Sequence, residues 1–234
     1  MVAKQLGLSP STVSEKITAL EQSPGVLKLN VTGAVMTDIL PPIMNPFLLR
    51  YPLLRVEIMV DDRLVDATSA GCDAGIRYGE QLAKDNIAVP IGPRPQTLAL
   101  AAAPSYLALQ GLPSHSADLA EHDRIRLKYS SGALIPWQFE WQGKTVSVNP
   151  AGRLIIGVNG AAVAIEFARQ GRGIIATFEN GLQPDFETGE LVAVLPEWWS
   201  AFKGPWLYFP SRFMSAPLRA FVDFLKQDAV AQSS

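Results

Sequence analysis

The chain has 234 residues, of which 48% are hydrophobic and 18% are charged, and its formal net charge is −2. This composition excludes a disordered chain, and the small net charge excludes nucleic-acid binding through bulk charge. A single cysteine, Cys72, excludes an internal disulfide. No apolar run approaches the ~20 residues of a membrane span, and the residues after Met1 lack the apolar stretch of a secretory signal, so we expect a cytoplasmic protein.

Residues 1–22 are predicted to form two short helices around a tight turn. Gly7 ends the first helix, and Ser9-Pro10 is a typical start for the second. Apolar residues at spacings of four and three then share one face of the second helix, namely Val13, Ile17 and Leu20. Near this helix's start lie side chains suited to contact DNA phosphates and base edges, namely Ser9, Ser11, Thr12, Ser14 and Lys16. The pattern fits a helix-turn-helix and, equally, a helical hairpin with a solvated face.

From residue 25 the sequence alternates predicted strands and helices. The strands are expected over residues 26–31, 56–60, 72–77 and 87–91, and the helices over residues 35–48 and 64–70. Pro41, Pro42 and Pro46 interrupt the first helical pattern, so we expect a kink or a late start there. This β-α-β order predicts a parallel or mixed sheet with helices on its faces.

A strand over residues 97–103 is predicted to cross into a second α/β unit. Helices are expected there over residues 105–110, 116–121 and 161–170, strands over 125–129, 173–178 and 191–195, a hairpin over 137–148 and a buried strand over 154–158. A strand over residues 206–209 is predicted to cross back. An amphipathic helix over residues 216–227 then docks on the first unit.

Small polar residues follow three of the predicted strands, as Thr32-Gly33, Ser130-Ser131 and Asn159-Gly160. Ligands of open α/β sheets bind outside the carboxyl ends of the strands, so two facing units would bring these residues to one cleft. Thr32-Gly33 also precedes a helix, whose N-terminal N–H groups suit a polar or anionic ligand. Arg77, at the end of its own strand, could pair with a carboxylate or form a surface ion pair. The alternative for the polar residues is ordinary turn and capping chemistry.

Signs of catalysis are sparse in this sequence. It contains no nucleophile elbow, phosphate-binding loop or dinucleotide-binding glycine motif. His115 and His122 lack cysteine or carboxylate partners at metal-ligand spacing, and we predict that both are solvated. Cys72 precedes an apolar strand and is predicted to be a core residue rather than a nucleophile. We therefore predict no enzyme, no catalytic residue, no cofactor and no metal.

Four longer stretches are more specific than any of these patterns alone. They are Ala3–Ser14, Phe47–Pro52, Asp73–Gly79 and Ala101–Tyr106. Together they resemble the LysR-type transcriptional regulators and cover both the helix-turn-helix and the α/β units. The resemblance implies two Rossmann-like α/β subdomains joined by two crossover strands, similar to type 2 periplasmic binding proteins. The expected boundaries are 1–22 for the helix-turn-helix remnant, 25–99 with 205–230 for the first subdomain and 100–204 for the second.

The resemblance also implies a function. The cleft would hold a small-molecule effector, such as an organic acid or an aromatic compound, on Thr32, Gly33, Arg77, Ser130, Ser131, Asn159 and Gly160. The intact family architecture binds promoter DNA as a homodimer or tetramer, without a membrane partner. The effector, the target genes and the choice between activation and repression stay open.

Three departures from the family pattern affect these expectations. The family has a helix before the stretch that begins here, and a wing and linker helix where Gln22-Ser23-Pro24 runs directly into the effector domain. Glu15 stands where a basic residue is usual, and Ala34 lacks a hydroxyl that many members carry. The alternative function is therefore an effector-binding or solute-binding module without DNA binding of its own.

Overall fold

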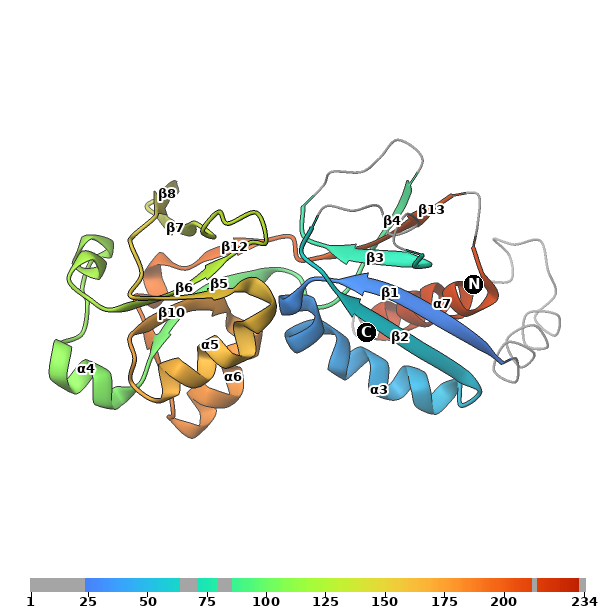
Figure 1. Ribbon diagram of the computed structural model, residues 1–234, viewed down its shortest axis with the longest axis horizontal. Coiled ribbons are helices and arrows are strands. Elements are labelled where there is room, and N and C mark those ends of the chain that lie inside the picture. Colours follow the sequence, from blue (N-terminus) through green and yellow to red (C-terminus); the bar gives the residue numbers. More distant parts are fainter. Residues whose placement is uncertain (1–23, 64–70, 80–85, 212–213, 232–234) are drawn as a thin grey trace.

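The protein consists of two α/β subdomains that lie side by side (Figure 1). This computed structural model describes residues 24–63, 71–79, 86–211 and 214–231. The helices predicted within residues 1–22 and over residues 64–70 lie outside the described residues. Each subdomain has its own sheet and its own apolar core, which confirms the predicted fold class.

Subdomain I is built on a five-stranded sheet of order β2-β1-β3-β13-β4. The strands are β1 (Gly25–Val31), β2 (Leu54–Val60), β3 (Ala74–Arg77), β4 (Asn86–Pro90) and β13 (Trp206–Pro210). β1, β2 and β3 are parallel, whereas β13 returns antiparallel between β3 and β4. Because Leu27, Leu29 and Val31 are fully buried, β1 forms the centre of this core.

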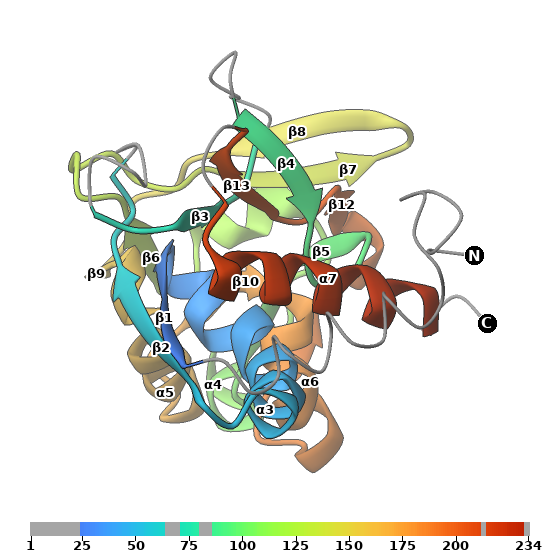
Figure 2. The same ribbon diagram turned by 90° about the vertical axis from the view of Figure 1, so that its right-hand side faces the viewer.

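Helices α3 (Leu40–Arg50) and α7 (Ala216–Ala231) pack together on this sheet (Figures 1 and 2). The Phe47 ring meets the Phe221 ring edge-on at 5.1 Å between centroids, a favourable aromatic geometry. A π-helical turn, η1 (Val35–Ile39), precedes α3. Pro41 and Pro42 occupy the first turn of α3, directly after this π-helical turn. The helical path already begins at residues 33–34, so the prolines do not delay it; the irregularity is the π-helical turn before them, and Pro46 lies inside α3.

Subdomain II has a second sheet of order β11-β5-β10-β6-β9, with β12 also paired to β5. The strands are β5 (Gln96–Ala102), β6 (Arg124–Lys128), β9 (Leu154–Gly157), β10 (Ile174–Phe178), β11 (Val192–Val194) and β12 (Ser200–Phe202). A separate hairpin joins β7 (Trp137–Trp141) to β8 (Lys144–Val148). The helices are α4 (Pro104–Gln110), α5 (Ala161–Arg169) and α6 (Glu179–Thr188), and the 3-10 turns are η2 (Ser116–Ala120), η3 (Val158–Gly160) and η4 (Pro196–Trp198).

Two predictions for subdomain II are wrong. The strand expected to be buried over residues 154–158 is β9, whose residues alternate between half-buried and exposed because β9 lies at the edge of the sheet. His122, expected in solvent, is buried and hydrogen-bonded through Nδ1 to the Tyr106 hydroxyl at 3.2 Å. This burial lowers the pKa of His122. The predictions for exposed His115 and buried Cys72 are confirmed.

Helix α6 has no counterpart among the predicted elements. Gly181 and Pro184 lie within it, and both residues have low helix propensity. The helix is stabilised instead by tertiary contacts, because Leu182 is fully buried and Asp185 accepts a hydrogen bond from Arg169 Nε at 2.6 Å. Among the described helices, none combines the length and apolarity that crossing a membrane requires.

Candidate ligand-binding site

The two subdomains touch where β1 ends and where β9 ends. A Cβ atom placed on Gly33 would lie 2.6 Å from Asn159 Cα and 2.7 Å from the Val158 carbonyl oxygen. Real side chains do not tolerate such distances, so only glycine allows this approach. The backbones of two predicted strand ends, Thr32-Gly33 and Asn159-Gly160, are therefore in contact.

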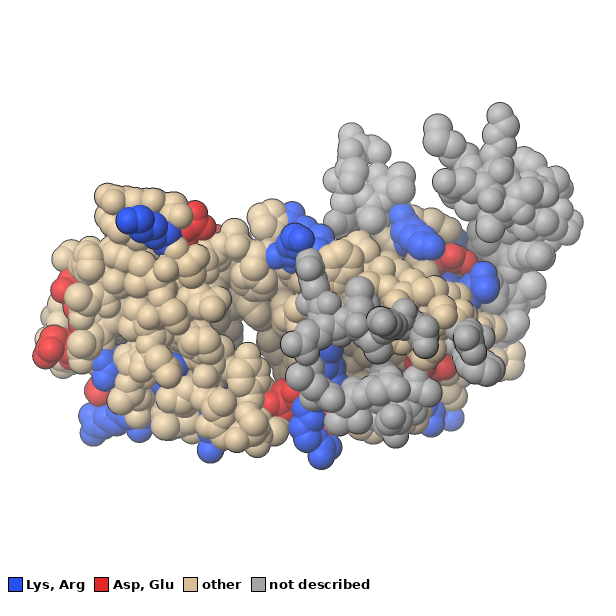
Figure 3. Space-filling model, turned by 90° about the horizontal axis from the view of Figure 1, so that it is seen from above, with Lys and Arg blue, Asp and Glu red and all other residues tan. Residues whose placement is uncertain are grey.

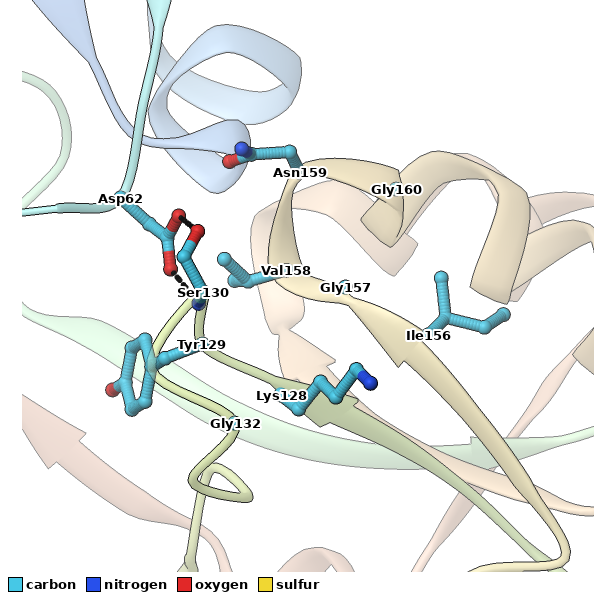
Figure 4. A pocket seen from close by; sticks show the side chains of 10 residues that line it. All are labelled: Asp62, Lys128, Tyr129, Ser130, Gly132, Ile156, Gly157, Val158, Asn159 and Gly160. Carbon is cyan, nitrogen blue, oxygen red and sulfur yellow. Dashed lines mark hydrogen bonds between the residues drawn. The ribbon is translucent and has the colours of Figure 1, made fainter.

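A cavity of about 290 Å³ opens beside this contact, at the carboxyl ends of β6 and β9 (Figure 4). Its lining comes mostly from subdomain II, with Asp62 from subdomain I; the residues are Asp62, Lys128, Tyr129, Ser130, Gly132, Ile156, Gly157, Val158, Asn159 and Gly160. Ser130, Asn159 and Gly160 were predicted site residues. Seen from above, a narrow gap separates the subdomains, and charged side chains are scattered over the described part of this face (Figure 3).

Asp62 and Ser130 form a bridge across the mouth of the cavity. The Ser130 backbone N–H donates to Asp62 Oδ2 at 2.6 Å, and the Ser130 hydroxyl donates to Asp62 Oδ1. Burial acts to raise the pKa of Asp62, but the hydrogen bonds from Ser130 together outweigh it and lower that pKa. Sequence reasoning missed Asp62, although its position just after β2 follows the same strand-end rule that selected Ser130.

Arg77 is turned toward its own sheet. Its guanidinium donates to the backbone oxygens of Asn30 at 3.0 Å and Ile76 at 2.9 Å, and also to the Asn30 side-chain oxygen. Burial lowers the pKa of Arg77, and the charges of Asp61 and Asp62 act in the opposite direction. The Arg77 charge therefore stays close to the cleft carboxylates, although Arg77 does not line the cavity.

Thr32, Gly33 and Ser131 lie near the cavity but outside its lining. Thr32 Oγ1 accepts from the Val35 N–H at 3.5 Å, and Ser131 Oγ accepts from the Ala133 N–H at 3.4 Å. These are the local turn bonds that we named as the alternative for such residues. Thr32 is half-buried and Ser131 is exposed, so both hydroxyls are near the cleft but engaged locally.

A second contact between the subdomains lies closer to the crossover strands. The Asp38 carboxyl of η1 lies against Gly181 in the first turn of α6, where an added Cβ would be 2.6 Å from Asp38 Oδ1. The Asn180 side chain donates to the Asp38 carbonyl oxygen at 3.4 Å and accepts from the Gln96 amide at 3.0 Å. Burial raises the pKa of Asp38 to about 7. This contact places an ionisable group inside the junction of the two subdomains.

The arrangement offers hydrogen-bond donors and acceptors for a small polar ligand. Among the described residues, no three His, Cys, Asp or Glu side chains gather as metal ligands would. The cavity contains one cation, Lys128, and one carboxylate, Asp62. Backbone and side-chain polar groups of Asp62, Ser130 and Asn159 are thus available to a ligand in the cavity.

Comparison with known proteins gives consistent results. Residues 20–230 match the LysR substrate binding domain. The HTH-type transcriptional regulator YcaN of Escherichia coli K12 is 35% identical over 210 residues, which cover 89% of this chain and 68% of that protein. The regulator DmlR of the same organism is 26% identical over 274 aligned positions, covering 97% of this chain and 88% of that protein.

Solved structures show the same architecture. A variant of full-length AphB is 27% identical and superposes with a TM-score of 0.71, covering 92% of this chain and 72% of that one. The regulatory domain of CrgA from Neisseria meningitidis, a LysR-type transcriptional regulator, is 23% identical with a TM-score of 0.74. That match covers 88% of this chain and 99% of the CrgA domain, so nearly the whole regulatory-domain fold is present here.

Proposed function

This chain belongs to the family of LysR-type transcriptional regulators, and we propose that its inter-subdomain cleft binds a small organic acid or aromatic compound as effector. The observation that carries the proposal is the cavity of about 290 Å³ at the carboxyl ends of β6 and β9, which Asp62 of subdomain I also lines. Its size suits a small ligand, and its polar groups lie where α/β sheets usually bind ligands.

We propose roles for the predicted residues in this cleft. Ser130, Asn159 and Gly160 would contact the effector directly, since they line the cavity. Figure 4 shows the Asn159 side chain directed toward the segment that follows β1, where Thr32 and Gly33 lie. Thr32, Gly33, Ser131 and Arg77 lie outside the lining, and we propose that they contact the effector in a more open cleft.

The mechanism we propose is a shift in the balance between open and closed cleft. An effector that contacts both subdomains stabilises the closed form by its difference in affinity for the two forms. The proposed units are residues 25–99 with 205–230 and residues 100–204, with β5 entering the second sheet at Gln96 and β13 returning to the first. Since its relatives are regulators, we assign the chain no catalytic activity.

DNA binding is proposed through the helix-turn-helix of residues 1–22. Ser9, Ser11, Thr12, Ser14 and Lys16 would contact promoter DNA in a homodimer or tetramer. One observation favours the alternative of an effector-binding module without DNA binding of its own. The alignment with DmlR spans 274 positions, more than the 234 residues of this chain, so that regulator contains residues with no counterpart here.

Thermal shift against a panel of small organic acids and aromatic compounds tests the cleft. Ligands should raise the melting temperature of the wild-type chain and lose this effect in the Thr32→Val, Asn159→Leu double variant. Thr145→Val, at an exposed position of the β7–β8 hairpin, is the matched control and should respond like wild type. Equal stabilisation of all three proteins would show that the ligands bind elsewhere.

A gel shift with promoter DNA tests the DNA-binding proposal. If the helix-turn-helix of residues 1–22 binds DNA, the chain should shift promoter DNA, and Ser11→Ala or Lys16→Ala should weaken that shift. Because phosphate contacts depend strongly on salt, the assay should cover low to physiological ionic strength. A chain that binds no DNA anywhere in this range would favour the effector-binding module.

A further inference from the structure

The cleft contains a carboxylate that belongs to the chain itself. Asp62 follows β2 in subdomain I, and Ser130 follows β6 in subdomain II (Figure 4). Both carboxylate oxygens of Asp62 are engaged, one by the Ser130 backbone N–H at 2.6 Å and the other by the Ser130 hydroxyl. The pair therefore joins two subdomains at the mouth of the cavity through one side chain.

We propose that the N–H and hydroxyl of Ser130 form a carboxylate-binding site, which Asp62 occupies in the closed cleft, and that a carboxylate effector binds by displacing Asp62. This inference rests on the proposed effector-binding function and specifies its ligand class. Asp62 would then act as an internal competitor, which keeps the site filled until an external acid replaces it.

The donor geometry is what points to a carboxylate. Ser130 presents two donors to two oxygens of one group, and an ionised carboxylate accepts hydrogen bonds at both oxygens. Hydrogen bonds to an ionised acceptor are shorter and roughly twice as strong as neutral ones. A carboxamide has only one acceptor oxygen, and its NH₂ group would face a second donor. The lowered pKa of Asp62 agrees with stabilisation of the ionised form.

The charges around the cavity favour an added anion once Asp62 has left. Lys128 lines the same cavity, and the Arg77 charge interacts with Asp61 and Asp62. The neighbouring carboxylate Asp61 is directed elsewhere, because it accepts from Arg63 Nη2 at 2.7 Å and Arg63 Nε at 3.0 Å. Asp61 is therefore a matched control with the same charge, one residue away and without a contact to Ser130.

The opposite reading is that Asp62 recognises a cationic ligand directly. In that case the removal of Asp62 would weaken binding of an amine and leave carboxylates unaffected. The cavity itself argues against this reading, since both Asp62 oxygens are already bonded to Ser130 and the additional charged residue in the lining is the cation Lys128. The two readings predict opposite effects of one substitution.

The test compares wild type, Asp62→Ala and Asp61→Ala by titration with sodium acetate, acetamide and methylammonium chloride at constant ionic strength. The backbone amide of Ser130 is followed by ¹H–¹⁵N NMR. In Asp62→Ala its proton signal should move upfield as the hydrogen bond is lost, and acetate should return it toward the wild-type position. Acetate should bind Asp62→Ala about tenfold more tightly than it binds wild type, as expected for a charge-assisted hydrogen bond. Acetamide and methylammonium should have no such effect.

Three outcomes would overturn the inference. They are equal acetate binding by Asp62→Ala and wild type, an equal gain in Asp61→Ala, and methylammonium binding that Asp62→Ala abolishes. Asp62→Asn, which keeps the side-chain volume, replaces Asp62→Ala if the latter does not fold and should show a smaller gain for acetate. If the inference fails while panel ligands still depend on Thr32 and Asn159, the proposed function stands with another ligand class. If those residues have no influence on any ligand, the proposed function itself fails.

Discussion

Replacing Asp38 by asparagine should make the protein more stable at neutral pH. Asp38 lies in η1 against the first turn of α6, with its carboxyl oxygens 2.6 and 3.0 Å from the position of a Cβ on Gly181. Burial raises its pKa from 3.8 to about 7. Tyr78 interacts with Asp38, and its pKa is raised by burial and also by the Asp38 charge.

The size of the effect follows from the shift in pKa. Each pKa unit corresponds to about 1.4 kcal/mol, so the shift of Asp38 amounts to about 4 kcal/mol. The N-terminus of α6 attracts a carboxylate, but this attraction is typically worth about 1 kcal/mol or less and does not offset the cost of burial. Because the folded-state pKa lies above the unfolded value, the contribution of Asp38 to stability is fully present below pH 3.8 and is lost as the pH rises through about 7.

Urea unfolding of wild type and Asp38→Asn at several values between pH 4 and pH 8 measures this effect. The difference in the free energy of unfolding, variant minus wild type, should increase by about 2 to 4 kcal/mol over this range. Other titrating groups such as His122 cancel in the difference. A difference that does not change with pH would show that Asp38 ionises normally in the folded protein, and the reasoning from burial would be wrong.

Two substitutions test other contacts. Gly33→Ala should force the subdomains apart, since its Cβ would lie 2.6 Å from Asn159 Cα, and X-ray scattering should show a larger radius of gyration. The control is Gly157→Ala, whose Cβ would have no atom within 4 Å. This control should leave the radius of gyration unchanged. Arg169→Leu should lower the free energy of unfolding by about 3 to 5 kcal/mol, because Asp185 is 1% exposed and would lose its partner. Arg153→Leu, which breaks the exposed pair with Asp123, should cost less than about 1 kcal/mol in chemical denaturation. Equal effects of the two arginine substitutions would contradict the role of burial.

The sequence was sufficient to predict most of the fold because, in most elements, the apolar periodicity and the glycine and proline residues that end helices and strands indicate the same boundaries. The strand predicted over residues 26–31 is β1, and the helix predicted over residues 216–227 lies within α7, with Phe221 and Val222 buried as expected. Helix α6 was missed for a physical reason. Its Gly181 and Pro184 oppose helix formation, and the contacts that stabilise it come from Arg169 on another helix.

The candidate site was only partly accessible to sequence reasoning. The strand-end rule selected Ser130 and Asn159, which line the cavity, because it depends on local order along the chain. Asp62 also follows a strand end, but its contact with Ser130, 68 residues away, is not visible in the sequence. The strand-end rule also did not indicate that Arg77 would turn toward the Asn30 carbonyl oxygen. Side-chain direction in a cleft depends on neighbours from the other subdomain, and no local pattern specifies them.

The contacts across the cleft differ in their chemistry, and this difference suggests how the closed form is controlled. The Gly33 contact with Asn159 is a steric fit between backbones, so it depends little on pH or ligand. In the proposed mechanism, the Asp62–Ser130 bridge would stabilise closure while Asp62 is ionised, whereas ionised Asp38 would oppose the burial that closure imposes on it. At neutral pH these two carboxylates act in opposite directions on the same equilibrium. A ligand that takes over the role of Asp62 at Ser130 would therefore need only a small difference in affinity to shift the balance between the open and closed forms.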